Sequence, residues 1–205
     1  MIALFNYFVK ITGWLPYALI CRSKVSYEDK NAQSRHLKGK AILLSNHTSV
    51  YDYALYLFIF FFRTLRFQMA EVLYKKKLLA LFLSMMGGIY VNRDTLDFSF
   101  MDESKAILEK GGVVGIFPES RLPKEGEARP LPFKESATIL ALESGAPIIP
   151  LYTKGNYFTK SRTRLIIGKP INVRDYYDNS KSEKENVTNI TNILRNKIIE
   201  LGEKL

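Results

Sequence analysis

A histidine and an aspartate, His47 and Asp52, stand five positions apart in the segment Ser-Asn-His-Thr-Ser-Val-Tyr-Asp. A carboxylate bound to one nitrogen of a neutral imidazole leaves the other nitrogen as a general base, able to take a proton from an alcohol. Five positions on a continuous helix turn the chain through about 140°, so the two side chains would point apart there. We therefore expect His47 in a turn and Asp52 in the first turn of the helix that follows.

Two apolar runs flank this pair. Residues 41–44 have the length of a strand, and residues 53–62 have the length of a helix. The pair is thus predicted at a strand-to-helix junction, where the two side chains can meet. A second interpretation stays open: Ser49 and Asp52 match a capping box with aspartate in place of glutamate, and Asp52 would then serve only the helix N-terminus.

A second group of polar residues, Glu119 and Arg121, lies in a Phe-Pro-Glu-Ser-Arg segment after an apolar run at 112–116. That run is typical of a buried parallel strand, and open α/β sheets bind ligands at the carboxyl ends of such strands. Another short strand, at 87–93, ends in Arg93. Two arginines at strand ends suit a phosphate because each guanidinium offers paired donors. Taken singly, each arginine is better explained by a surface ion pair.

The other elements alternate along the chain. We predict helices at 98–110, 134–144 and 182–205, strands at 67–71, 147–153 and 164–168, and a loop at 122–132. The last helix is charged and amphipathic, and we expect it to form a solvated outer face. The run at 53–62 is too short for a bilayer, which needs roughly 20 residues, and is predicted as a core helix. The alternatives are that it extends the lipid-facing surface or lines an acyl-chain groove. The pattern predicts one α/β domain with a mostly parallel central sheet flanked by helices.

Five segments, in this order, resemble the motif blocks of the glycerolipid acyltransferases. They are residues 46–52 (NHxSxxD), 88–93 (glycine to arginine), 117–119 (the opening of FPEGTR), 132–134 (FK) and 146–151 (the last, proline-bearing strand). The resemblance covers residues 10 to 170, and the first block is the specific one. Two departures concern the acceptor: Arg121 comes one residue earlier than the arginine of FPEGTR, and Ala70 stands where many members carry a lysine nearby.

The resemblance implies that His47, oriented by Asp52, deprotonates the free hydroxyl of 1-acyl-sn-glycerol-3-phosphate. The oxygen then attacks the thioester of an acyl-CoA or acyl carrier protein, and backbone amides after His47 stabilise the oxyanion. Ser49 caps the helix rather than acting as a nucleophile. No cofactor and no metal are expected. Substrate binding is assigned to Asn46, Arg93, Glu119, Arg121 and Lys134.

Three alternatives stay open. The acceptor could be another lysolipid, or the chain could be a non-catalytic membrane-binding protein of the same fold. The third is a metal-assisted phosphoesterase in which His47 and Asp52 are metal ligands. Two histidines and one cysteine argue against a dedicated zinc site.

The charge distribution favours an anionic membrane surface as partner. The 205 residues, enough for one domain with a sizeable core, carry a net charge of +10. Residues 1–100, the most apolar half, hold 13 Lys and Arg against 6 acidic residues. Nucleic acid is not expected as a partner, because the chain lacks an RNP-like aromatic pattern, zinc-ligand spacing and a basic recognition helix.

Residues 1–20 are almost wholly apolar apart from one narrow polar stripe at helical spacing. The stripe consists of Asn6, Lys10, Gly13 and Tyr17. A lysine midway along a spanning helix costs about 2.5–3.5 kcal/mol on insertion scales, which favours a helix lying in the interface. Arg22 and Lys24 follow it. A cleavable signal peptide is not expected, because residues 1–20 show neither a basic n-region nor an A-x-A-like cleavage site. We therefore divide the chain into a membrane-associating segment, 1–24, and an acyltransferase domain, 25–205, on the cytoplasmic face of the membrane, peripheral or monotopic.

Overall fold

The strands and helices are described in a computed structural model for residues 1–205 except 22, 96, 156, 160 and 161. The strands are Lys24–Tyr27 (β1), Ala41–Ser45 (β2), Leu65–Ala70 (β3), Ile89–Val91 (β4), Val113–Ile116 (β5), Ile148–Lys154 (β6) and Arg164–Ile167 (β7). The helices are Ile2–Ile20 (α1), Asp52–Ile59 (α2), Lys77–Met86 (α3), Ser99–Glu109 (α4), Ser136–Ser144 (α5) and Glu183–Glu203 (α6). Two short 3₁₀ helices are Glu71–Lys75 (η1) and Val173–Tyr176 (η2).

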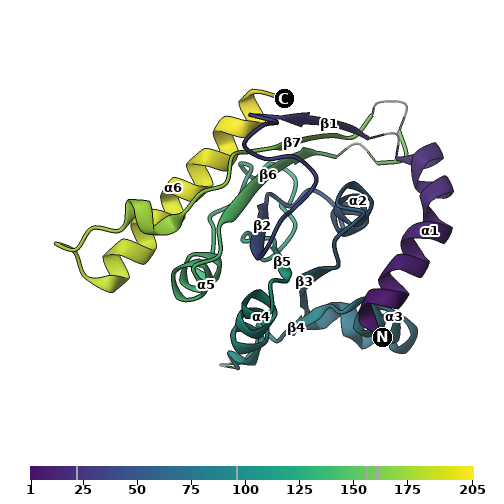
Figure 1. Cartoon of the computed structure of the whole chain (residues 1–205), viewed down its shortest axis with the longest axis horizontal. Helices are drawn as coiled ribbons and strands as arrows, with labels where there is room; N and C mark the ends of the chain where they lie inside the picture. The colour runs from purple at the N-terminus through teal and green to yellow at the C-terminus, as the bar shows by residue number, and fades with distance from the viewer. Residues whose placement is uncertain (22, 96, 156, 160–161) are drawn as a thin grey trace.

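Across the described residues the seven strands form one sheet in the order β1-β7-β6-β2-β5-β3-β4 (Figure 1). Neighbouring strands run parallel, except for the antiparallel pair β6 and β7. Each strand and helix predicted from the sequence is present, with ends that differ by up to three residues. The predicted α/β fold with a mostly parallel sheet is therefore confirmed.

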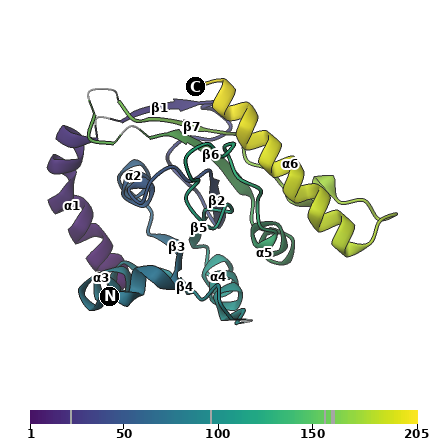
Figure 2. The same ribbon diagram turned by 180° about the vertical axis from the view of Figure 1, so that it is seen from behind.

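Helices cover both faces of the sheet. On β2, Leu43 packs toward α2, whereas Ile42 and Leu44 pack into the cluster formed with α4, α5 and α6. This alternation follows from the pleat of a strand, whose successive side chains point to opposite faces. Figures 1 and 2 show the same layers from both sides, with α1 outside α2 and the N-terminus beside α3. The predicted core helix is confirmed, because Leu55 and Tyr56 of α2 are fully buried.

The last helix, α6, is amphipathic as predicted, and its charged side faces solvent. It begins with a capping box between Ser182 and Glu185. The apolar side of the helix then packs against the sheet. The buried apolar residues of this side are Val187, Ile190, Leu194, Ile198 and Leu201. Only the opposite, charged side of the helix faces solvent, because the three- and four-residue spacing of the apolar positions needs a partner to bury them.

The polar stripe of α1 is present, but it faces the protein. Asn6 and Lys10 are fully buried. The Asn6 amide donates to the carbonyl of Met86 at 2.9 Å, at the end of α3. The Lys10 ammonium donates to the carbonyls of Phe61 at 2.9 Å and Arg63 at 2.6 Å, just after α2. These carbonyls follow helix ends, where backbone acceptors lack intrahelical partners, so the stripe fixes α1 to α2 and α3.

The C-terminal half of the stripe, Gly13 and Tyr17, packs closely against one aromatic ring of α2. A Cβ atom at Gly13 would come within 2.8 Å of the Phe58 ring, and the ring of Tyr17 stacks on Phe58 at 4.4 Å. The opposite face of α1 is exposed and apolar, with Leu4, Phe8, Ile11, Trp14, Leu15 and Leu19. Among the described residues no helix combines the length and the apolar character that crossing a bilayer requires. Arg22, predicted beside this helix, lies outside the described residues.

Burial lowers the pKa of Lys10 to about 8, because the charged ammonium loses contact with water. The two carbonyls are the hydrogen-bond acceptors that stabilise the ammonium there. We expect Lys10→Met to lower the free energy of unfolding by about 2–3 kcal/mol, since it leaves buried acceptors unsatisfied. Urea unfolding followed by circular dichroism measures this. Thr12→Ala is the control, because its hydroxyl bonds only to carbonyls of its own helix, and it should change the value by less than about 0.5 kcal/mol. Equal losses in both variants would contradict the clamping role of Lys10.

Candidate active site

The predicted polar residues meet at the carboxyl ends of three adjacent parallel strands. His47 follows β2, and Glu119 follows β5. Thr153 lies near the end of β6, and β2 pairs with both β5 and β6. Because these strands are parallel, their carboxyl ends share one edge of the sheet, where α/β folds bind ligands. Sheet topology therefore brings together residues up to 107 positions apart in the chain.

His47 and Asp52 meet as the strand-to-helix junction predicts. His47 stands in the turn after β2, and Asp52 is the first residue of α2. The imidazole Nδ1 lies 2.9 Å from Oδ2 of Asp52, whose side chain is 0% exposed, against 18% for His47. The imidazole also stacks on the ring of Phe117 at 4.1 Å. With Nδ1 donating to a carboxylate, Nε2 is the nitrogen that can accept a proton.

The Asp52 carboxylate accepts five hydrogen bonds, an arrangement that stabilises a buried negative charge. Its Oδ2 accepts from the imidazole of His47, from the amide of Thr48 at 2.7 Å and from the amide of Ser49 at 3.0 Å. Its Oδ1 accepts from the hydroxyl of Thr48 at 3.1 Å and from that of Tyr157 at 2.5 Å. The carboxylate therefore organises the whole turn that carries the imidazole.

Half of the predicted capping box is present: the Ser49 amide donates to the Asp52 carboxylate at 3.0 Å, whereas the Asp52 amide donates to the Ser49 carbonyl rather than to its hydroxyl. The N-cap of α2 is Tyr51, without a side-chain cap, and the Ser49 hydroxyl accepts from the amide of Tyr51 at 3.2 Å. The Asp52 carboxylate binds amides of the preceding turn rather than those inside the helix. The same contacts occupy the amides of Thr48, Ser49 and Tyr51, so these three amides are not the oxyanion donors expected after His47.

Asn46 and Glu119 hold the His47 turn in place. The Asn46 amide donates to the carbonyl of Thr153 at 2.9 Å and accepts from its N–H at 2.8 Å. Glu119 accepts from the backbone N–H of His47 at 2.8 Å and from that of Leu131 at 2.8 Å. Burial raises the pKa of Glu119, while the two amides oppose that shift. Both side chains, predicted to bind substrate, thus make their hydrogen bonds inside the protein.

The predicted cations pair with acidic neighbours. The Arg93 guanidinium contacts Glu71 at 2.8 and 3.0 Å and donates to the carbonyl of Ser120 at 2.8 Å, beside Glu119. This pairing lowers the pKa of Glu71 to about 2. Arg121 makes two contacts of 2.7 Å with Glu127, along the loop, and lowers the pKa of Glu127 to about 2.

Lys134 is exposed and lies two residues before α5, so the predicted helix start at 134 is wrong. Its backbone N–H donates to the carbonyl of Pro118 at 2.9 Å, which ties this segment to the loop after β5. The structure thus gathers His47, Asp52, Asn46 and Glu119, brings Arg93 to the adjoining loop, and leaves Arg121 and Lys134 at the exposed margin.

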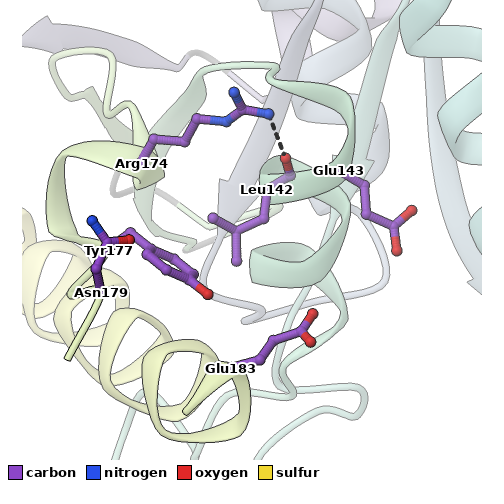
Figure 3. Close-up of a pocket in the computed structure, with 6 residues that line it drawn as sticks. All are labelled: Leu142, Glu143, Arg174, Tyr177, Asn179 and Glu183. Atoms are coloured by element: carbon purple, nitrogen blue, oxygen red, sulfur yellow. Dashed lines mark hydrogen bonds between the residues drawn. The ribbon is translucent and has the colours of Figure 1, made fainter. Parts of the chain in front are cut away.

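Sequence reasoning missed Tyr157, which belongs to no motif in the chain. The available signal was its place just after a strand that pairs with the one before His47. A hollow of about 470 Å³ lies elsewhere, between α5, η2 and α6 on the other face of the sheet (Figure 3). Its lining residues are Leu142, Glu143, Arg174, Tyr177, Asn179 and Glu183, and Arg174 donates to the carbonyl of Leu142. Within the described residues, no three His, Cys, Asp or Glu side chains gather as a metal site needs.

The sequence is similar to a protein family and to named bacterial proteins. A family model described as Acyltransferase matches residues 24–154. A Borreliella burgdorferi protein named 1-acyl-sn-glycerol-3-phosphate acyltransferase is 30% identical over 184 residues, covering 82% of this chain and 68% of the relative. A Bacillus subtilis protein of the same name is 29% identical over 138 residues, covering 65% of this chain and 66% of the relative. The chain thus spans about two thirds of each relative's length.

A solved structure shares the fold. The chain is similar to the 1-acyl-sn-glycerophosphate (LPA) acyltransferase PlsC from Thermotoga maritima, with a TM-score of 0.67 and 21% sequence identity. The match covers 96% of this chain and 79% of the other. At this identity the likeness establishes the α/β architecture, including the N-terminal helix. The matched family region, in turn, contains His47, Asp52, Asn46 and Glu119.

Proposed function

The chain belongs to the acyltransferase family, and on that premise we propose that it acylates the free hydroxyl of 1-acyl-sn-glycerol-3-phosphate, with acyl-CoA or acyl carrier protein as donor. The observation that carries the proposal is the 2.9 Å contact between Nδ1 of His47 and the buried Asp52 carboxylate. The names of the two bacterial relatives support this choice of acceptor.

In the proposed reaction Asp52 holds the imidazole, and Nε2 of His47 takes the proton of the acceptor hydroxyl. The hydroxyl oxygen bonds to the thioester carbonyl carbon, and the carbonyl oxygen becomes an oxyanion. When the carbon–sulfur bond breaks, the sulfur leaves with the proton from the imidazolium. A positioned general base contributes about 10²–10⁴-fold. Holding the two substrates together and stabilising the oxyanion supply the rest.

We propose that residues 1–24 and α3 seat the enzyme on the cytoplasmic leaflet. The outward face of α1 is apolar, and Leu78, Leu81, Phe82 and Met85 of α3 are exposed as well. Phe5 of α1 contacts Phe82 of α3, so the two exposed faces adjoin. The lysines at 75–77 are exposed at the start of α3. An apolar face beside lysines suits a bilayer with anionic headgroups.

We propose further that Arg93 binds the acceptor phosphate. A guanidinium has five N–H donors, and the contacts with Glu71 and Ser120 use three of them. The Arg93 side chain is 37% exposed, and Ser120, whose carbonyl accepts from it, is the residue after Glu119. Arg93 therefore combines a fixed orientation with free donors near the site, which suits a phosphate oxygen. Arg121 and Lys134 stay predicted contributors at the margin.

Arg93→Lys should raise the apparent KM for 1-acyl-sn-glycerol-3-phosphate by about tenfold and leave the KM for acyl-CoA within about twofold. Lysine keeps the positive charge but lacks the planar set of guanidinium N–H donors that can bind Glu71 and a phosphate at the same time. Steady-state kinetics with each substrate varied in turn measures both constants. Arg174→Lys, on the far face of the sheet, is the matched control and should change neither. A fall in kcat alone, with an unchanged acceptor KM, would contradict phosphate binding by Arg93.

Purified protein incubated with labelled acyl-CoA and a panel of lysophospholipids tests the function itself. Mass spectrometry of the products should identify phosphatidic acid as the main product. A different acylated phospholipid would overturn the acceptor and keep the reaction. Binding to vesicles without acylation of any lysolipid would favour the non-catalytic membrane-binding alternative, and a divalent-metal requirement with phosphate release would favour the phosphoesterase.

A further inference from the structure

The connection between β6 and β7 delivers one side chain to the His47–Asp52 pair. The hydroxyl of Tyr157 donates to Oδ1 of Asp52 at 2.5 Å, across 105 positions of sequence. Burial and the adjacent negative charge of Asp52 raise the pKa of Tyr157, so the phenol keeps its proton and acts as the donor. Tyr157 is therefore the one contact to the carboxylate that comes from outside the turn and α2 among the described residues.

The backbone around Tyr157 is shaped for this contact. A Cβ atom at Gly155 would lie 2.5 Å from the Tyr157 ring and 2.7 Å from the hydroxyl of Thr48, so only glycine lets this loop come so close. Phe158 has a φ angle of +59°, which is unfavourable for a bulky residue, and its ring packs edge-on against Tyr51 at 4.7 Å. Such a conformation persists only where the surrounding contacts enforce it, and the contact with Tyr51 is one of them.

The two carboxylate oxygens of Asp52 have different hydrogen-bond partners. Oδ2 faces the imidazole of His47 and two amides of the turn, whereas Oδ1 faces two hydroxyls, those of Thr48 and Tyr157. A donor on Oδ1 restricts rotation of the carboxylate about its Cβ–Cγ bond. It thereby keeps Oδ2 aimed at Nδ1 and keeps the imidazole in the tautomer whose Nε2 is free.

We propose that Tyr157 is a positioning residue for acyl transfer, acting through Asp52 to hold the imidazole of His47 in its working orientation. The inference rests on the proposed function. It differs from a purely structural role, in which Tyr157 would anchor the β6–β7 connection without affecting the geometry of the imidazole. The two roles make different predictions for turnover, for coupling to Asp52 and for the spectrum of His47.

Tyr157→Phe removes only the hydroxyl. We expect kcat to fall about tenfold to hundredfold, because misplaced reacting groups lose rate steeply, with KM for both substrates within about twofold. The melting temperature should stay close to that of the unmodified protein. Tyr53→Phe is the matched control: its hydroxyl is buried without a hydrogen-bond partner among the described residues, and kcat should stay within about twofold. An unchanged kcat in Tyr157→Phe overturns the inference.

A double-mutant cycle with Asp52→Asn tests whether the effect passes through the carboxylate. The combined loss in kcat should be well below the product of the two single losses, since residues that act through one another are not additive. Losses that multiply in full would show that Tyr157 acts independently of Asp52 and would overturn the inference.

A spectroscopic readout separates failure of this inference from failure of the proposed function. In protein labelled with ¹⁵N-histidine, the proton on Nδ1 of His47 reports the bond to Asp52 without any substrate. We expect Tyr157→Phe to move this resonance and Tyr53→Phe to leave it in place. If the unmodified protein acylates no lysolipid, the proposed function fails while this spectrum still decides the role of Tyr157. A resonance that stays unmoved in Tyr157→Phe overturns the inference.

Discussion

His47→Ala is expected to reduce acyl transfer by about 10²–10⁴-fold, the range that a positioned general base contributes. The imidazole is 18% exposed, and its Nδ1 is taken by Asp52, so Nε2 is the atom lost to the reaction. Glu119 contacts the backbone N–H of His47 rather than its side chain, so the turn should keep its shape in the variant. Turnover of labelled acyl-CoA measures the loss, and thermal unfolding and vesicle binding should stay nearly unchanged.

Asp52→Asn distinguishes the two interpretations of the aspartate. If Asp52 orients the imidazole, its amide variant should lose much of the turnover, though less than His47→Ala. If Asp52 served only as a helix cap, the variant would cost about 0.5–2 kcal/mol of stability and leave turnover nearly intact. Near-normal turnover in folded His47→Ala protein would refute the proposed function altogether.

The local part of the site could be predicted because it depends on neighbouring residues. A turn between a strand at 41–44 and a helix from 53 brings positions 47 and 52 together, whatever the rest of the chain does. The same holds for Glu119, since a loop after a buried strand of a parallel sheet opens at the ligand-binding edge. The structure has both features.

The partners of long side chains could not be predicted in this way. Whether Arg93 meets Glu71 or a distant loop depends on how β3 and β4 pair and where η1 begins. Tyr157 reaches Asp52 only because β6 lies beside β2, a pairing between segments more than 100 positions apart. Strand β1 was missed for the same reason: its four residues pair with the distant strand β7, in the register Lys24 to Arg164.

The direction of the α1 stripe also depends on tertiary structure. Helical periodicity predicts that one face differs from the rest, but not which face meets solvent. In a free interfacial helix, Lys10 would face water; here it is buried against the carbonyls of Phe61 and Arg63. The carbonyls at and just after the ends of α2 and α3 need donors, and Asn6 and Lys10 on the inner face of α1 supply them. The broad apolar face is therefore turned outward.

Replacing three residues of that outward face, Phe8, Trp14 and Leu15, with serine should weaken binding to anionic vesicles at least about a hundredfold. Their side chains are 60%, 55% and 60% exposed, so each can be buried by lipid. Burying one such side chain contributes about 1.5–3 kcal/mol, and about 2.7 kcal/mol suffices for a hundredfold change. The stripe of Asn6 and Lys10 stays intact, so α1 should remain attached to α2 and α3. Vesicle co-sedimentation measures the binding.

Turnover on two kinds of substrate then tells whether this face acts through the bilayer. The triple variant should be much slower on acceptor embedded in vesicles and within about twofold of normal on acceptor dispersed in detergent, which reaches the site without a membrane. The control, Tyr176→Ser with Tyr177→Ser, alters two exposed aromatics of comparable size near α6 and should leave vesicle binding unchanged. Equal losses on both substrates would mean that the outward residues support the fold of α1, and the membrane assignment of residues 1–24 would then lose its physical basis.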